Sequence, residues 1–67
     1  MFGRTKINKI LRILRKERGL SQEKLARLAN VSNNTIINIE RGENHNPTTA
    51  TVKKIARALG VEPKDLM

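Results

Sequence analysis

The sequence predicts a small all-α domain, a compact bundle of five short helices, and three observations support this fold class. Apolar residues recur at intervals of three and four along most of the 67 residues, which gives a helix one apolar face. Glycine or asparagine follows four of these apolar segments, as expected where a helix ends. The length suits one domain, spanning residues 1–67 with its core at about residues 6–66.

The first helix is expected at about residues 6–18, with Thr5 as its N-cap. Lysine and arginine occupy the side opposite its apolar positions, so the helix is amphipathic. Gly19 can adopt the left-handed conformation that ends a helix. The apolar positions of this helix are Ile7, Ile10, Leu11 and Leu14.

Two short helices follow, joined by residues 30–32. Ser21 is expected to cap the second helix, which runs through Ala29, and Ser32 to cap the third, which ends at Arg41-Gly42. Two short helices with a three-residue connection have the dimensions of a helix-turn-helix, although any helical hairpin could share them.

The remaining residues predict a loop, a fourth helix and a final turn. Residues 43–47 are polar and aperiodic, which indicates a surface loop. Thr48 or Thr49 caps the fourth helix, whose apolar residues repeat at helical spacing until Gly60. Pro63 suits a first helical position, so one last turn is expected near the carboxyl end.

Composition favours a polyanionic partner and excludes several other classes. Fourteen Lys and Arg against six Asp and Glu give a net charge of +8, which favours nucleic acid. The absence of cysteine excludes disulfides, thiolate zinc sites and a cysteine nucleophile. No apolar run approaches the ~20 residues that span a bilayer, and no secretory signal is visible. We therefore expect a cytoplasmic protein with no membrane partner.

The sequence does not predict an enzyme. His45 is the only histidine, and it lies in the loop, far in sequence from any paired acid or nucleophile. The six carboxylates show no metal-ligand spacing, and there is no phosphate-binding glycine loop. We expect no catalytic residue, no metal and no cofactor.

The third helix carries an uncharged polar face at its amino-terminal end. An asparagine amide can form two hydrogen bonds with an adenine edge, and threonine can reach bases or phosphate. Ile37 adjoins this face and could contact a thymine methyl group. The alternatives are a solvated polar face whose residues only help capping, and an isoleucine at the edge of the core. The polar residues are Asn33, Asn34, Thr35 and Asn38.

Charge is distributed as DNA binding would require. The net charge is +6 in residues 1–18, zero in residues 19–47 and +2 in residues 48–67. A neutral helix that reads bases, flanked by cations that contact phosphates, fits the usual division between specifying and positioning contacts. The alternatives for the basic first helix are a solvated face and a membrane surface.

Several stretches resemble one known family over about residues 7–66. They are residues 11–26, with the run Gly-Leu-Ser-Gln at 19–22, Val31-Ser32 through Ile36, Ile39-Glu40-Arg41-Gly42, Pro47 and residues 55–61. Together they are similar to the phage repressor and Cro family of helix-turn-helix domains, also called the xenobiotic-response-element family. The resemblance implies a lambda-repressor-like domain that binds operator DNA, usually as a symmetric homodimer, with the third helix in the major groove. It implies a transcriptional regulator, most simply a repressor.

The resemblance also assigns roles to individual residues. Arg15 and Glu40 match an ion pair between helices in relatives, and exposed apolar residues around Val61, Leu66 and Met67 are expected to form the dimer surface. Lys24 departs from the family's usual acid. The expected base contacts are Asn33, Asn34, Asn38 and Ile37, and the expected phosphate contacts are Gln22, Thr35, Arg41, Arg12, Arg15, Ser21 and Asn44.

The resemblance leaves a second class of function open, because one domain can serve several roles. The same domain occurs in phage repressors, in regulators of mobile elements and in antitoxins. The alternative is therefore an antitoxin or interaction module whose main partner is a toxin or another protein.

Overall fold

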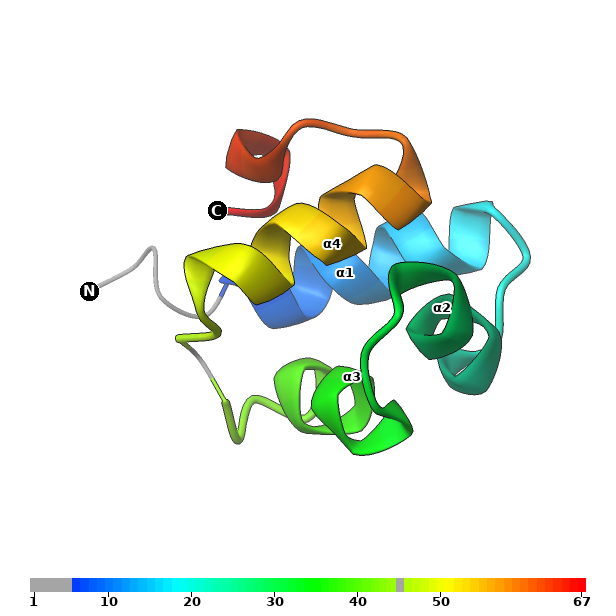
Figure 1. Cartoon of the computed structure of the whole chain (residues 1–67), viewed down its shortest axis with the longest axis horizontal. Coiled ribbons are helices and arrows are strands. Elements are labelled where there is room, and N and C mark those ends of the chain that lie inside the picture. The colour runs from blue at the N-terminus through cyan, green and yellow to red at the C-terminus, as the bar shows by residue number, and fades with distance from the viewer. Residues whose placement is uncertain (1–5, 45) are drawn as a thin grey trace.

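The computed structural model describes residues 6–44 and 46–67, and over these ranges it contains helices joined by turns and loops, with no strand. Thr5 and His45 lie outside the described residues. Five elements follow one another along the chain (Figure 1): α1 (Lys6–Glu17), α2 (Gln22–Ala29), α3 (Asn33–Glu40), α4 (Thr49–Leu59) and a 3-10 helix, η2 (Pro63–Leu66). The all-α prediction is correct, whereas the predicted five-helix bundle is corrected to four α-helices and one 3-10 turn.

The hydrogen bonds of the final element make it a 3-10 turn rather than an α-helix. The Asp65 amide donates to the Glu62 carbonyl at 2.9 Å, and the Met67 amide donates to the Lys64 carbonyl at 3.2 Å. Both bonds span three residues, which is the 3-10 pattern. The Asp65 carboxylate also accepts from the Glu62 amide at 3.0 Å, so the turn is closed at its start.

Hydroxyl caps begin the three later α-helices at the predicted positions. Ser21 accepts from the Lys24 amide at 3.0 Å, and Ser32 accepts from the Thr35 amide at 3.1 Å. For α4 the cap is Thr48 rather than Thr49, with a 3.2 Å bond from the Thr51 amide. Each hydroxyl oxygen satisfies an amide that has no partner within its helix, so the local sequence fixes where each helix starts.

Left-handed residues end the helices where the sequence places glycine or asparagine. Asn30 has φ 60° and is the only residue other than glycine with positive φ in the described ranges. Its amide donates back to α2, and Val31 donates to the Ala26 carbonyl at 3.0 Å, so the chain turns sharply into α3. The helix-turn-helix geometry depends on this turn.

The core is aliphatic and lies between α1, α4 and the α2–α3 pair. In Figure 1 α1 and α4 lie at the centre, with α3 on one side of the molecule and η2 on the opposite side. α3 packs on α1 and α2, whereas η2 packs on α1 and α4. The largest fully buried side chains are Leu11, Leu25, Ile36, Ile39, Ile55 and Leu66.

Leu66 corrects part of the expected dimer surface. Its side chain is fully buried, because η2 folds back over α1 and α4. Met67 is instead 68% exposed, and Val61 is half-buried. The tail therefore contributes one residue to the core of its own chain and leaves the others at the surface.

Candidate nucleic-acid interface

One face of α3 points away from the rest of the protein. Ile36, Ile39 and Glu40 form the buried side of this helix. The residues at i, i+3, i+4 and i+7 from Asn34 lie opposite them because a helix turns 100° per residue. Together these residues form what we call the outer face of α3: Asn34, Ile37, Asn38 and Arg41.

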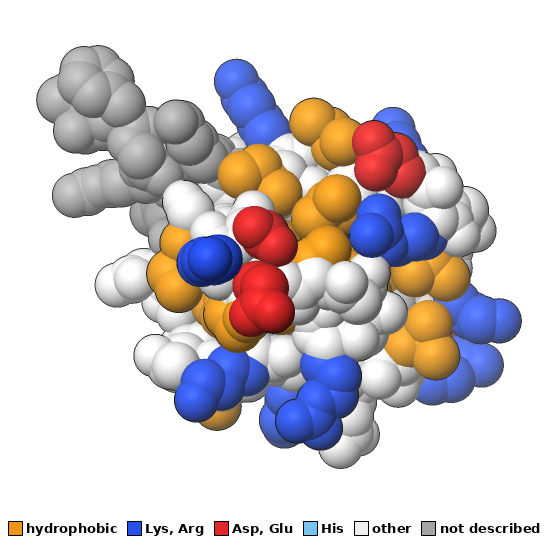
Figure 2. Space-filling view, turned by 90° about the horizontal axis from the view of Figure 1, so that it is seen from above, with side chains coloured by type: hydrophobic (Ala, Val, Ile, Leu, Met, Phe, Trp, Pro, Cys, Tyr) orange, Lys and Arg blue, Asp and Glu red, His pale blue; other side chains and the backbone are white. Residues whose placement is uncertain are grey.

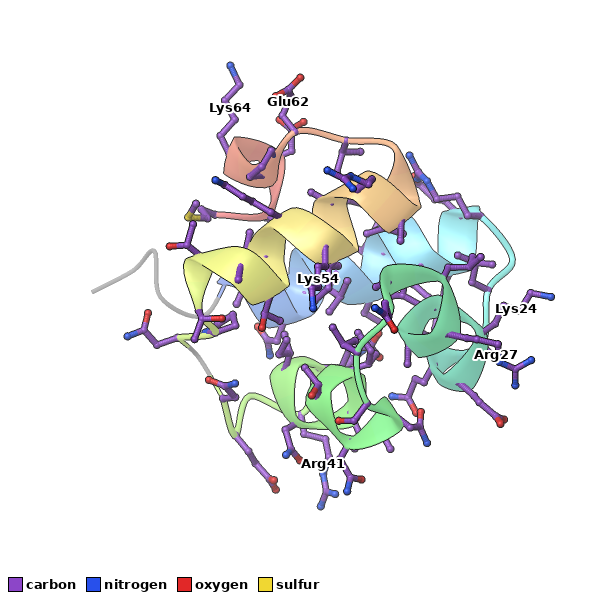
Figure 3. All side chains as sticks on the ribbon, in the orientation of Figure 1. Lys24, Arg27, Arg41, Lys54, Glu62 and Lys64 are labelled. Carbon is purple, nitrogen blue, oxygen red and sulfur yellow. The ribbon has the colours of Figure 1, made fainter. Side chains whose placement is uncertain are left out.

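The outer face is accessible and carries a single charge. Asn34 and Arg41 are exposed, whereas Ile37 and Asn38 are half-buried. Figure 3 shows α3 at the edge of the molecule, with Arg41 pointing away from the other helices. Asn33 is also exposed, in the first turn of the helix. Of the four expected base-contact residues, the structure thus places three on the outer face and the fourth beside it.

The buried side of α3 is held by a carboxylate in the middle of the fold. Glu40 is 2% exposed, and its Oε2 accepts from Arg15 Nε at 2.6 Å. Its Oε1 accepts from Arg15 Nη2 at 3.0 Å and from Gln22 Nε2 at 3.1 Å. The ion pair implied by the family resemblance is therefore formed, and it ties α1, α2 and α3 together. Three charge-assisted hydrogen bonds satisfy a carboxylate that would otherwise be costly to bury.

Arg15 forms hydrogen bonds inside the protein, so less of its side chain is available to a phosphate than the sequence indicated. Its side chain is 11% exposed, and its remaining nitrogen, Nη1, donates to the Leu20 carbonyl at 2.7 Å. All three nitrogens thus have intramolecular acceptors. The structure thus assigns Arg15 to the ion pair, whereas its expected contact with phosphate stays a prediction.

Arg12 combines a structural contact with an exposed side chain. Its Nη2 donates to the Glu40 carbonyl at 2.9 Å, so it caps the carboxyl end of α3. A cation at this end also interacts favourably with the helix dipole. The guanidinium has five N–H donors, and the residue is exposed, so donors remain for a phosphate.

The other expected phosphate contacts lie at the start of α2, at the start of α3 and in the loop after α3. Ser21 and Gln22 lie at the start of α2, and Thr35 lies in the first turn of α3, where its hydroxyl is 2.7 Å from that of Ser32. Asn44 lies in the loop after α3, and its Oδ1 accepts from the Asn46 amide at 3.1 Å. The capping hydroxyls and this loop amide are thus partly engaged within the chain.

The structure shows two contacts that the sequence analysis missed. Gln22 bonds to Glu40, 18 residues away, and Arg41 Nη2 lies 3.5 Å from Glu43 Oε2. Distant pairs such as Gln22 and Glu40 leave no periodic signal in a single sequence. The second pair has a weak signal, since opposite charges stand two residues apart where a helix ends.

The side opposite α3 has a different character. Figure 2 views the molecule from this side and shows apolar side chains at the surface, with acidic and basic side chains among and around them. η2 lies here, next to the exposed Met67. Over residues 6–44 and 46–67 no helix has the length and apolar character of a membrane span, and no cluster of ligating side chains suits a metal ion.

Comparisons with known proteins agree with this arrangement. A family model described as helix-turn-helix matches residues 11–66. Control protein C.BamHI of Bacillus amyloliquefaciens is 41% identical over 67 residues, covering 100% of this chain and 76% of that protein. The immunity repressor of Bacillus phage phi105 is 40% identical over 52 residues, and the match spans only 35% of its length. The crystal structure of the restriction-modification controller C.AhdI from Aeromonas hydrophila has a TM-score of 0.87 and 38% identity, with 94% of each chain covered.

Proposed function

This chain belongs to the helix-turn-helix family, a family of DNA-binding transcriptional regulators rather than enzymes, and we propose that it binds a specific operator with α3 in the major groove. The observation that carries the proposal is the outer face of α3. It exposes amides beside an isoleucine on a helix whose other side is anchored in the core. The major groove is wide enough to admit one α-helix and presents a distinct pattern for each base pair.

The chemistry of the outer face favours adenine and thymine. Asn34 and Asn38 each offer one donor and one acceptor, which match N7 and the N6 amino group of adenine. Ile37 lies to one side of them on the helix surface and offers an apolar contact to a thymine methyl group. Asn33 is placed to add a contact at the start of the helix. We therefore propose an operator half-site that contains A·T pairs at its centre.

The phosphate contacts are proposed to lie at the start of α2, at the start of α3 and around the carboxyl end of α3. Arg41 and Arg12 are exposed cations near the carboxyl end of α3, and both can neutralise phosphates. Ser21, Gln22, Thr35 and Asn44 offer uncharged donors, which fix register without adding charge.

We propose that the protein binds its operator as a symmetric homodimer and acts as a repressor. One short reading helix offers little interface, and two copies would double it. Half-sites read by such dimers lie about 34–36 Å apart, so the operator is expected to be roughly palindromic. The apolar area around Met67 and Val61 is proposed as part of the dimer surface, in an arrangement that leaves both α3 helices facing one duplex. The DNA target implies a cytoplasmic location.

Selection of bound sequences from random DNA tests this function. The proposal expects one enriched motif, nearly palindromic, with A·T pairs in each half. Affinity for the enriched duplex should fall steeply with salt, since phosphate contacts release counterions. No enriched motif, or an affinity that is indifferent to salt, would contradict DNA recognition by this face.

A further inference from the structure

We infer that Glu43 limits how tightly the protein binds any DNA, by occupying Arg41 before a phosphate can. The inference rests on the proposed function, since it assumes that the outer face of α3 meets DNA. Arg41 Nη2 and Glu43 Oε2 are 3.5 Å apart, and their side chains are 63% and 56% exposed. A carboxylate therefore stands beside the cation of the reading helix, on the surface that DNA would approach.

The backbone holds Glu43 in this place. Gly42 has φ +79°, a conformation that turns the chain at the end of α3, and its amide donates to the Ile39 carbonyl at 3.1 Å. The Glu43 amide then donates to the Asn38 carbonyl at 2.9 Å. Because both bonds return to the last turn of α3, the backbone of Glu43 is fixed relative to this helix.

The pair neutralises the only charge on the outer face. Arg41 is the single ionised residue among the four that form it, three positions after Asn38 and seven after Asn34. With Glu43 beside it, the outer face of α3 has no net charge of its own. The sequence is neutral over residues 19–47 although the whole chain carries +8, which agrees with a reading surface of low net charge.

The carboxylate beside Arg41 changes the salt dependence of DNA binding. A free arginine that neutralises one phosphate contributes about 0.9 to the slope of log affinity against log salt. A carboxylate within a few ångströms opposes that gain, because it competes for the guanidinium and repels the phosphate. The affinity for the operator and for unrelated duplexes falls by the same factor. Base contacts therefore supply a larger share of the remaining binding free energy for the operator.

The test compares Glu43→Gln with a matched control, Glu17→Gln. Glu17 is 63% exposed and lies 3.6 Å from Arg18, so its replacement makes the same charge change at a similar pair. It lies about 140° around α1 from Arg12, the side chain that contacts α3. Affinity is measured by fluorescence anisotropy for the selected operator and for an unrelated duplex, between 0.05 and 0.2 M salt.

The inference predicts that Glu43→Gln steepens the slope by about 0.9 per bound protomer for both duplexes. If the gain vanishes near 1 M salt, affinity rises about 4-fold at 0.2 M and about 15-fold at 0.05 M per protomer. Glu17→Gln should change neither slope by more than a small fraction of this. Thermal unfolding should stay the same in both variants, because both carboxylates are exposed.

A second comparison tests whether Glu43 acts through Arg41. In an Arg41→Ala background, Glu43→Gln should lose most of its effect on the slope. An unchanged slope in Glu43→Gln, with wild-type binding to the operator intact, would overturn the inference and leave the proposed function standing. If Glu43→Gln changed the slope as much in the Arg41→Ala background as in the wild-type protein, the inference would also be overturned. Wild-type protein with no salt-dependent binding to any duplex would reject the proposed function itself.

Discussion

Two arginine–glutamate pairs lie at the carboxyl end of α3, and they differ in burial rather than in chemistry. The side chains of Arg15 and Glu40 are 11% and 3% exposed, and Arg15 Nε lies 2.6 Å from Glu40 Oε2. Arg41 and Glu43 are 63% and 56% exposed and lie 3.5 Å apart. The two carboxylates are three residues apart in the sequence. We conclude that burial assigns one pair to holding the fold and leaves the other available to a ligand.

The physical reason is the cost of separating each pair. Breaking a buried pair leaves one charge without a partner in a poorly solvated site, whereas breaking an exposed pair lets water solvate both groups. Glu40 also accepts from Gln22 and lies between three helices, so its loss affects all of them. Glu43 bonds to the rest of α3 through its backbone amide, which a side-chain substitution retains.

The largest expected effect comes from breaking the buried pair. Arg15→Ala and Glu40→Ala should each lower the free energy of unfolding by about 3–5 kcal/mol. In a chain of this size such a loss is a large part of the total stability. Urea or thermal unfolding followed by circular dichroism measures it. If neither variant changed the free energy of unfolding measurably, the buried pair would contribute no more to stability than the exposed pair, contrary to this account.

The next effect concerns the third donor to Glu40. Gln22→Ala removes the amide that bonds to Glu40 Oε1 at 3.1 Å but keeps both arginine bonds. We expect a loss of about 1.5–3 kcal/mol, the usual value for a hydrogen bond to a charged group. The neighbouring Glu23→Ala serves as the control, because Glu23 is 72% exposed and pairs only with Arg27 in the described structure. A loss no larger than that of the control would show that Gln22 does not support Glu40.

A smaller effect is expected from the glycine that positions the exposed pair. Gly42→Ala places an L-residue at φ +79°, which costs about 1–2 kcal/mol. The new Cβ would lie 3.6 Å from Asn8 Nδ2, an ordinary contact, so the cost is conformational. Gly19→Ala, at φ +68° with no atom near the new Cβ, should cost a similar amount. A much larger loss at Gly42 would indicate that the turn is packed against Asn8 more tightly than the distance suggests.

The smallest effect on stability is expected at the exposed pair itself. Glu43→Ala, Arg41→Ala and the double variant should give a coupling of about 0–1 kcal/mol, as for other surface pairs. Unfolding measurements on the three variants test this value. A coupling close to that of Arg15 and Glu40 would mean that exposure does not separate the two pairs.

The elements of the fold were predictable because local residues determine them. Ser21 and Ser32 cap helices at the positions that the sequence predicted, and Asn30 and Gly60 end helices by adopting positive φ. The last segment was predicted as a fifth helix of one turn, and it forms a 3-10 turn over Pro63–Leu66. Each of these features depends on a few consecutive residues.

The candidate site was only partly predictable. Helical spacing places Asn34 and Asn38 on one face, and the structure agrees. The spacing does not show that Arg15 donates hydrogen bonds to Glu40 and to the Leu20 carbonyl. It also does not show that Leu66 is buried where η2 packs on α1 and α4. These outcomes depend on residues that are distant in sequence, and a single sequence has no signal for them.

The central claim is that the outer face of α3 reads bases while the inner side only holds the helix. It is tested most directly by a binding cycle that combines Asn34→Ala or Asn38→Ala with single base-pair changes in the selected operator. Wild-type protein should lose about 1–3 kcal/mol of binding free energy at the A·T pair that each amide contacts. The matching alanine variant should lose nothing further at that pair and should remain folded. If both variants rank all operator changes as the wild-type protein does, α3 does not read the operator.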